Sequence, residues 1–530
     1  MVTADSPGAD TVAGVAAVSR RSVLSAGAVG AVLTLAPVEF ASAAGGSTGA
    51  GGGSGPRSVT VTGHLDPGAA DWVYLPVRVP TGVNRMNVSY DYSRPAVAPG
   101  QLGNACDIGV FDEKGTNLGG AGFRGWSGGF RTSFSVAADA ATPGYLPGSV
   151  NPGTWNVALG PYQVSPVGLD YTVTVTLEFG APRTPAFRPA YPPQARPGTT
   201  RRWYRGDCHL HTVYSDGRRT PAEVAAAARA ARLDFMVSTD HNTSSSHGVW
   251  GPLAGPDLLI VTGEEVTTRN GHVLTLGIPP GAFVDWRYRA VDEVFATVAE
   301  RVRSAGGIVV PAHPFCPYVG CRWKFGYDDA DAVEVWNGPW TLDDEHSVVM
   351  WDGLLAHRAV RGLPFLPAMA NSDAHSEPQV VGFPQTVVRA DGLSARALTA
   401  ALAAGHSYLA ESADVELSFT AAAGGRTATM GERLDAGLAT PVAVTLNVSG
   451  VPNGTVRFIT DEGQSIQQSL PSSGSGTVRW VTTGRLSGYV RAEVRHPLPD
   501  GSPGSGTAIS TMPTLGAMAA MTNPIALRGV

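Results

Sequence analysis

Residues 220–241 have the sequence TPAEVAAAARAARLDFMVSTDH, which contains one helix signal followed by one strand signal. Thr220-Pro-Ala-Glu223 has the spacing of a capping box with proline in the first turn, so a helix is expected from there to about Arg232. Phe235-Met-Val-Ser238 is a short apolar run of the kind that forms buried parallel strands. The stretch therefore predicts a helix–strand unit of an α/β fold.

The same alternation of alanine-rich helix signals and apolar strand signals extends from Arg201 to about Ala410. Further strands are expected at 258–261, 273–276, 308–310, 332–335 and 365–369, and further helices at 291–304, 348–360 and 395–404. Repeated alternation over this length is typical of a closed α/β barrel.

The regions on either side of this barrel have a different pattern. Short alternating segments separated by Gly, Pro and Asn run from Arg57 to Phe179, which indicates a β-sandwich, and β patterning resumes after Glu411. The predicted organisation is a signal peptide at 1–43, a Gly/Ser-rich linker at 44–56, a β-sandwich at 57–180, a Pro-rich linker at 181–200, an α/β barrel at 201–410 and a small β-domain at 411–530.

The N-terminal segment has the features of a twin-arginine export signal. Arg20-Arg21 precedes an apolar run from Val23 to Ala36, and Ala41-Ser-Ala43 provides a small-residue cleavage site. The apolar run is shorter than the roughly 20 residues that a membrane span requires. We therefore expect an exported protein, extracellular or on the cell-envelope side, that has no membrane anchor after signal cleavage.

The four cysteines fit an exported protein. Cys316 and Cys321 are close enough in sequence to close a small loop, and a disulfide between them is expected in an oxidising compartment. Cys208 lies between Asp207 and His209, and its side chain is expected to point away from theirs, in a structural role.

Composition excludes some classes of function. The chain has 530 residues, of which 43% are hydrophobic and 15% charged, as in ordered globular proteins. Its net charge of −6 has no basic cluster, so no stable nucleic-acid partner is expected, whereas a small anionic substrate is compatible with it. The composition leaves the oligomeric state open.

Candidate metal ligands follow the predicted barrel strands. They are His209, His211, Asp240, His241, Glu264, Glu265, His313, Asp373 and His375, while His272 opens its own strand. The carboxyl ends of barrel strands share one face, so these side chains are expected to converge. They outnumber the ligands of a single tetrahedral zinc, and mixed imidazole and carboxylate ligation suits zinc, manganese or iron. The pattern predicts a multinuclear metal site.

The ordered motifs resemble those of the PHP (polymerase and histidinol phosphatase) superfamily, and in particular its exported CehA/McbA-type members, a group named for a carbaryl hydrolase. The motifs are Gly206-Asp-Cys-His-Leu-His211, Ser215-Asp-Gly217, Thr239-Asp-His-Asn242, Gly263-Glu-Glu265, Gly271-His272, Ala312-His-Pro314 and Ser372-Asp-Ala-His375. Met521-Thr-Asn-Pro524 resembles the tail of that subgroup. The resemblance implies a distorted (β/α)7 barrel.

The resemblance also implies two to three divalent transition metals (Zn, Mn or Fe) held by three ligand sets. The first is His209, His211, Glu265 and Asp373; the second is Glu265, His272 and His313; the third is Asp216, His241 and His375. Glu265 would bridge the first two metals, with Glu264 as the alternative bridge. Some members have histidine where this chain has Asp216, which puts the third metal's identity and affinity in question.

Other residues near these motifs are weaker candidates. Asp207 and Asp240 are expected to orient imidazoles, and Asn337 to hydrogen-bond the substrate unless it is an ordinary loop residue. Arg218 and Arg219 are expected either to clamp a phosphate or to lie in a solvated loop. Four other histidines of the barrel region have no motif around them and are expected at surface or helix positions: His247, His346, His357 and His406.

The functional expectation is a phosphoesterase that acts on mono- or diesters, such as nucleotides or oligonucleotide ends, through a metal-bridging hydroxide. A carbamate or carboxylic ester hydrolase is one alternative, and a surface-binding protein with a vestigial barrel is another. The common binuclear amidohydrolases need a bridging lysine soon after the first histidine motif. Lys324, the only lysine in the barrel, comes after His313, which is too late for that family.

Overall fold

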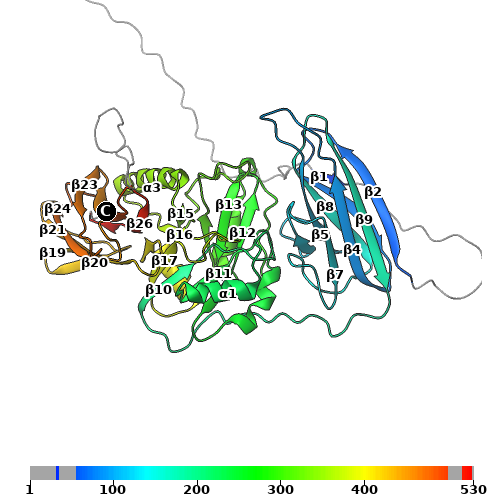
Figure 1. Ribbon diagram of the computed structural model, residues 1–530, viewed down its shortest axis with the longest axis horizontal. Coiled ribbons are helices and arrows are strands. Elements are labelled where there is room, and N and C mark those ends of the chain that lie inside the picture. Colours follow the sequence, from blue (N-terminus) through cyan, green and yellow to red (C-terminus); the bar gives the residue numbers. More distant parts are fainter. Residues whose placement is uncertain (1–31, 35–54, 499–515, 528–530) are drawn as a thin grey trace, which may run out of the picture.

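The computed structural model describes residues 32–34, 55–498 and 516–527. The predicted signal peptide and the Gly/Ser linker lie outside these ranges, except for residues 55 and 56 and for β1 (Val32–Thr34), which pairs in parallel with β3 (Trp72–Val79). The strands of the N-terminal region lie at one end of the molecule, β19 to β24 lie at the other, and the mixed α/β region lies between them (Figure 1).

Two antiparallel sheets build the N-terminal region. One contains β3, β8 (Gly153–Gln163), β5 (Ala105–Phe111) and β6 (Phe123–Trp126), and the other contains β2 (Arg57–Leu65), β9 (Leu169–Phe179), β4 (Val83–Tyr92) and β7 (Ser133–Ala137). Along β9, Tyr171, Val173 and Val175 are buried while alternate residues face solvent. Because side chains alternate between the two faces of a strand, each sheet has one apolar face, and these two faces pack together in a shared core.

The central region combines parallel and antiparallel strands. Strands β10 (Arg202–Asp207), β11 (Phe235–Ser238) and β12 (Leu259–Thr268) are parallel, whereas β13 (Gly271–Leu276), β14 (Ile308–Pro311) and β17 (Gln385–Ala390) join by antiparallel pairing. The helices are α1 (Pro221–Ala230), α2 (Phe295–Ser304), α3 (Leu342–Arg361) and α4 (Ala395–Ala403), with short 3-10 turns at Ser245–Val249, Gly251–Leu253 and Ala290–Asp292. The predicted capping box of α1 is confirmed: Thr220 and Glu223 exchange side-chain-to-backbone hydrogen bonds.

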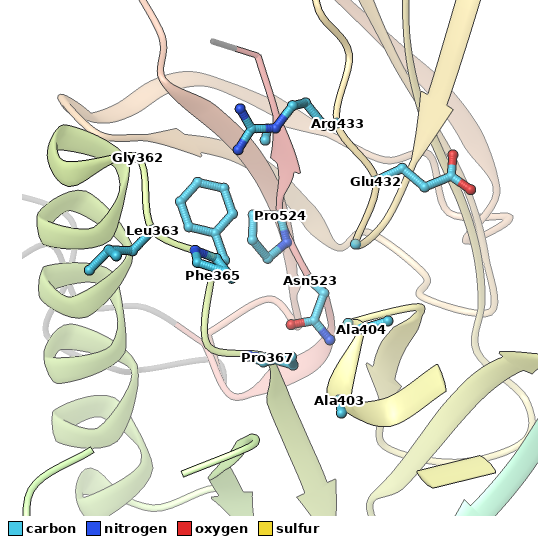
Figure 2. A pocket seen from close by; sticks show the side chains of 14 residues that line it. Gly362, Leu363, Phe365, Pro367, Ala403, Ala404, Glu432, Arg433, Asn523 and Pro524 are labelled. Atoms are coloured by element: carbon cyan, nitrogen blue, oxygen red, sulfur yellow. The ribbon is translucent and has the colours of Figure 1, made fainter. Parts of the chain in front are cut away.

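The expected closed barrel is not found as a continuous ladder among the described strands. Strands β15 (Val333–Asn337) and β16 (Ala368–Asn371) form a separate parallel pair. Side chains satisfy the backbone on the β17 side of this pair: Thr386 Oγ1 bonds Ala370 N and O at 2.9 and 2.7 Å, and the Asn523 amide bonds Ala368 N and O at 2.8 and 3.1 Å. Figure 2 shows Asn523 beside Pro367, just before this strand. These side chains take the place of the backbone of a neighbouring strand. The backbone groups of β16 are therefore satisfied on this side without a strand-to-strand hydrogen-bond ladder.

The sheet of the central region continues into the C-terminal strands. From β17 it passes through β18 (Ser407–Ala410), β26 (Met518–Thr522), β25 (Tyr489–Arg495), β22 (Thr455–Thr460) and β23 (Gly463–Ser469), with β27 (Ile525–Ala526) on β25. A second sheet contains β20 (Arg426–Thr429), β19 (Glu416–Ala423), β21 (Pro441–Ser449) and β24 (Gly476–Thr483). The two sheets share one apolar core.

A buried ion pair attaches the C-terminal strands to α3. Arg491 is fully buried and forms two hydrogen bonds with Asp352 at 2.7 and 2.6 Å, and a third with Glu493 at 2.8 Å. A paired and fully hydrogen-bonded guanidinium fixes the orientation of the elements that it joins. Across the described residues, no helix is both long and apolar enough to span a membrane.

Candidate metal centre

The predicted ligands come together where six strands end or begin. His209 and His211 follow β10, His241 follows β11, Glu265 lies within β12, His272 begins β13, His313 follows β14, and Asp373 and His375 follow β16. Two of these ligands, His313 and Asp373, have left-handed backbone conformations with φ of 27° and 49°. Non-glycine residues in this region carry strain, and such strain concentrates at functional sites.

Four buried atoms converge on one point and form the first ligand set. The Nε2 atoms of His209 and His211 lie 3.1 and 3.2 Å from Glu265 Oε2, and 3.2 and 2.9 Å from Asp373 Oδ1. None of the four atoms has a hydrogen-bond partner among the described residues. Ligand atoms at a tetrahedral ion with bonds of about 2.0–2.2 Å lie roughly 3.3–3.6 Å apart, so the set fits a metal with a small expansion. Buried polar atoms without partners are costly, and a cation removes that cost.

Glu265 also reaches the second ligand set with its other oxygen. Its Oε1 atom lies 2.9 Å from His272 Nδ1 and 3.2 Å from His313 Nε2, while Oε2 belongs to the first set. One carboxylate thus presents one oxygen to each of two neighbouring imidazole pairs. This is the geometry of a bridging ligand between two cations.

The third ligand set is more open. Asp216 Oδ1 lies 3.3 Å from His375 Nε2 and 3.6 Å from His241 Nε2. The other ring nitrogen of His241, Nδ1, lies 2.9 Å from Glu265 Oε2 and 2.5 Å from Thr267 Oγ1. His211 also belongs to this cluster. The exposed fraction of the Asp216 side chain is 36%, against 0% for Glu265.

The electrostatics of the cluster favour ionised carboxylates. Burial opposes ionisation of Glu265, yet the imidazoles of His241, His209 and His272 hold its pKa well below the ordinary value. Burial likewise opposes ionisation of Asp373, but His209 and His211 lower its pKa. Both groups are therefore anionic at neutral pH and available as metal ligands.

Gly217 allows the loop after β10, which contains His211 and Asp216, to pack closely against the backbone of His211. A Cβ atom at this position would lie 2.6 Å from the backbone carbon of His211 and 2.7 Å from its oxygen. Any side chain there would push the loop away from His211. This explains the glycine of the Ser215-Asp-Gly217 motif.

Glu334 is a site residue that the sequence reasoning missed. His209 Nδ1 lies 3.1 Å from Glu334 Oε1, and since Nε2 faces the ligand set, Nδ1 carries the proton and donates. The Glu334 carboxylate also accepts hydrogen bonds from Asn371 Nδ2 at 2.8 Å and His313 N at 2.9 Å. Glu334 thus orients one ligand side chain and one ligand backbone. A charged residue inside the apolar run at 332–335 was the signal that could have revealed it.

Asp207 and Asp240 were expected to orient imidazoles, but neither carboxylate contacts one directly; Asp240 reaches His211 only through Ser215, whose Oγ lies 3.4 Å from His211 Nδ1. Asp207 accepts hydrogen bonds from Ser372 Oγ at 2.5 Å and Gly382 N at 2.8 Å, and burial raises its pKa to about 6. Asp240 accepts from Thr212 N at 2.8 Å and Ser215 Oγ at 2.9 Å. The residues next to them in the sequence point into the cluster, whereas these two carboxylates point away from it. They therefore hold the loops that carry the ligands.

Asn337 and the two arginines have different placements. Asn337 Nδ2 donates to Glu334 Oε2 at 3.0 Å and to Asp373 Oδ2 at 3.3 Å, so it positions a ligand carboxylate. Arg219 is bound to Glu377 Oε1 and Gln379 O, both at 2.6 Å, and Arg218 is exposed. Neither arginine lines the pockets at the metal centre, so the structure does not support the expected phosphate clamp.

Three buried residues near the cluster are structural. The Glu264 carboxylate accepts from Val284 N at 2.8 Å and belongs to none of the ligand clusters, because side chains alternate along β12. His247 was expected near the surface but is fully buried; its Nδ1 accepts from Gly281 N, so its Nε2 donates to Gly263 O at 2.8 Å. Cys208 is free and lies in the apolar core of the central region, where burial raises its thiol pKa.

The cluster opens into two pockets on either side of a disulfide loop. Cys316 and Cys321 form the expected disulfide, and Cys321 Sγ lies 3.5 Å from His313 Nδ1. A polar pocket of about 660 Å³ includes Asn337, Asp343 and Asp373, and a second pocket of about 380 Å³ reaches Asp216, His241 and His272 from the side of the N-terminal sheets. The pocket of Figure 2, which includes Phe365 and Pro524, contains none of the predicted ligands.

Comparisons with known proteins show low similarity. No protein-family model and no curated protein matches the chain. It is similar to a two-domain protein from Bacteroides vulgatus that contains a predicted PHP-like metal-dependent phosphoesterase (15% identity, 65% of this chain and 100% of that chain covered, TM-score 0.32). It is also similar to an amidohydrolase from Chromobacterium violaceum with bound sulfate and no metal (20% identity, 33% and 89% covered, TM-score 0.25). A third similar structure is a proposed metal-dependent phosphoesterase from Bifidobacterium adolescentis (19% identity, 33% and 90% covered, TM-score 0.25). Similarities this low do not assign a function.

The contact between Glu334 and His209 leads to a prediction about activity and metal binding at the first ligand set. Glu334→Gln is expected to lower kcat/KM about ten- to hundredfold, because an amide holds the His209 proton less strongly than a carboxylate. Metal content is expected to fall in parallel at limiting metal concentration. Asp343→Asn, in the neighbouring polar pocket, serves as the control for a lost carboxylate. Wild-type activity and metal affinity in Glu334→Gln would show that Glu334 does not support His209.

Proposed function

We propose that the protein is a metal-dependent phosphoesterase that hydrolyses phosphate mono- or diesters. The observation that carries this proposal is the bridging geometry of Glu265: its Oε2 atom belongs to a set of four ligand atoms without hydrogen-bond partners among the described residues, and its Oε1 atom contacts His272 and His313 of the adjacent set. Two divalent cations held at this spacing, when bound, lower the pKa of a shared water toward neutrality and polarise a phosphoryl oxygen. The resemblance of the ordered motifs to the PHP superfamily supports the same reaction class, whereas the resemblance to its CehA/McbA-type members is the reason that carbamate hydrolysis is the alternative.

The residues around the cluster support an anionic substrate. The pocket residues closest to the ligands carry no lysine or arginine except Arg269, whose guanidinium is hydrogen-bonded to Pro161 O and Tyr162 O. Substrate charge must therefore be neutralised by the metals. Three divalent cations would carry twice the charge of the three carboxylates Asp216, Glu265 and Asp373, which leaves a net positive site. A phosphate that spans two cations offsets their mutual repulsion.

A comparison of substrate classes tests this proposal. We expect a phosphomonoester or phosphodiester to be hydrolysed with a higher kcat/KM than an aryl carbamate, because a neutral carbamate offers only a carbonyl oxygen to the cations. We also expect inorganic phosphate to inhibit competitively. Faster carbamate turnover without competition by phosphate would contradict the assignment and favour the carbamate hydrolase alternative, even with the same ligands.

We also propose that the enzyme acts outside the cytoplasm. The twin-arginine motif at Arg20-Arg21 and the Cys316–Cys321 disulfide support this, since stable disulfides form mainly in oxidising compartments. Sequencing the N-terminus of protein recovered outside the cytoplasm should find a start at Ala44. Protein found only in the cytoplasm with an intact N-terminus would contradict export.

A further inference from the structure

The N-terminal sheets supply one wall of the pocket that leads to the metal centre. The pocket of about 380 Å³, here called the aromatic pocket, is lined from the N-terminal region by Trp72, Asp107, Trp126, Phe130 and Tyr162. The central region contributes Trp286, Tyr318 and the ligands Asp216, His241 and His272. A group bound in this pocket would therefore contact the N-terminal region while its other end lies at the third and second ligand sets.

Three tryptophans form a rigid floor for the aromatic pocket. The ring centroids of Trp72 and Trp126 are 5.4 Å apart, those of Trp126 and Trp286 are 4.8 Å apart, and those of Trp72 and Trp286 are 5.7 Å apart. All three residues are buried, so their positions are set by core packing. All three line the aromatic pocket, so a ring bound there would pack against them in one of the arrangements that aromatic pairs prefer.

Two aromatic side chains at the rim are exposed. Phe130 is 43% exposed and Tyr318 is 76% exposed. The disulfide loop that carries Tyr318 is tied to the N-terminal region, because Tyr162 Oη donates to Val319 O at 2.9 Å. The rim is therefore held beside the floor, and exposed aromatic surface over a pocket is typical of a site that binds an apolar group.

Asp107 places a carboxylate among the aromatic side chains that the N-terminal region contributes to this pocket. Its side chain is half-buried, lines the pocket and has no hydrogen-bond or ion-pair partner in the described part of the chain. Arg269, the cation that acts electrostatically on Asp107, donates hydrogen bonds to Pro161 O at 2.6 Å and Tyr162 O at 3.3 Å and not to Asp107. Burial raises the Asp107 pKa to about 7, and Arg269 opposes this shift only in part. A half-buried acceptor without a partner favours a ligand that brings a donor.

We propose that the aromatic pocket binds a planar aromatic group bearing an N–H donor, with the ring on the tryptophan floor and the N–H directed at the Asp107 carboxylate. The proposal rests on the proposed function, since this group would be one arm of the phosphate ester whose phosphorus lies at the metal centre. It assigns the N-terminal region a part in substrate selection.

Two esters with matched leaving groups test the proposal in the metal-loaded enzyme. The phenols of 4-aminophenyl phosphate and 4-methoxyphenyl phosphate have similar acidity, but only the first presents an N–H donor. At about pH 8.5, above the Asp107 pKa of about 7, we expect the wild-type kcat/KM to favour the amino ester about tenfold, as for a hydrogen bond to a charged acceptor. Asp107→Asn is expected to reduce this ratio to about one, because its amide is also able to donate to the methoxy oxygen. Phe130→Ala is expected to lower kcat/KM for both esters while the ratio is kept.

Asp343→Asn is the matched control. Asp343 is also half-buried and lines the polar pocket on the other side of the disulfide loop. This variant is expected to keep the wild-type preference for the amino ester. Equal kcat/KM for the two esters in the wild-type enzyme, or the same loss of preference in both aspartate variants, would overturn the proposal.

Binding of 4-aminophenol, which has no ester, separates this proposal from the proposed function. Quenching of tryptophan fluorescence or calorimetry should show that 4-aminophenol binds more tightly than 4-methoxyphenol, and that Asp107→Asn removes the difference. If this holds while no phosphate ester is hydrolysed, the pocket assignment stands and the phosphoesterase assignment is wrong. If phosphate esters are hydrolysed and the two phenols bind equally, the pocket assignment is wrong.

Discussion

Glu265→Gln is expected to abolish turnover, with a loss in kcat well beyond the ten- to hundredfold that is typical of removing an outer partner of a metal ligand. The reason is that, among the described residues, only the Glu265 carboxylate has one oxygen in the first ligand set and the other in the second. The glutamine amide has a single oxygen and no charge, so it cannot bind one cation in the first ligand set and another in the second. Steady-state kinetics with saturating metal give the measurement. Asp216→Ala should lose less activity, because it serves only the third set.

Glu264→Gln is the matched control for this prediction. It removes the adjacent buried glutamate, whose carboxylate faces Val284 N on the other side of β12. Burial raises the pKa of Glu264 well above its ordinary value, so replacing its carboxyl with a neutral amide is expected to disturb this position little. Turnover is expected to stay close to wild type. An active Glu265→Gln enzyme together with an inactive Glu264→Gln enzyme would move the bridge to Glu264.

Removing the metals is expected to abolish turnover and to destabilise the central region. Without cations, Glu265 Oε2 and Asp373 Oδ1 are buried and have no hydrogen-bond partner among the described residues. A bound ion stabilises the folded state by about 4 kcal/mol when its free concentration is a thousand times its Kd. Dialysis against a chelator followed by calorimetry should therefore lower the unfolding temperature, and added Zn²⁺ or Mn²⁺ should restore both stability and activity.

The response of Glu265→Gln to the same treatment separates metal binding from other effects of the chelator. This variant has lost the bridge, so chelation should shift its unfolding temperature much less than that of the wild type. A chelated wild-type protein that is verified to be metal-free and still turns over substrate would contradict metal-dependent catalysis.

Several features of the site followed from the sequence because strand ends in an α/β fold share one face. The helix–strand unit at 220–241 has α1 and β11 where they were expected, and His241 lies directly after β11. His272 was placed at the start of its own strand, and antiparallel pairing of β13 with β12 brings it to Glu265. Local apolar runs and the order of polar residues after them contain this information.

Other features depend on contacts between distant residues, which a local pattern does not contain. The gap beside β16 is bridged by Asn523, a residue 155 positions away from Ala368. Glu334 meets His209 across 125 positions, and Asp107 faces the metal centre from a different sheet altogether. His247 has no motif around it, yet two backbone groups fix it in the core, where burial lowers its pKa to about 4.

The metal content of fully active protein tests the central claim most directly. Elemental analysis of the purified chain, with activity measured on the same sample, should find two to three divalent transition-metal ions per chain. The ligand atoms form one set around His209, one around Asp216 and two overlapping groups that contain His272, which provides room for this number. One ion or fewer in a sample with full activity would contradict the multinuclear site, and with it the bridging role of Glu265.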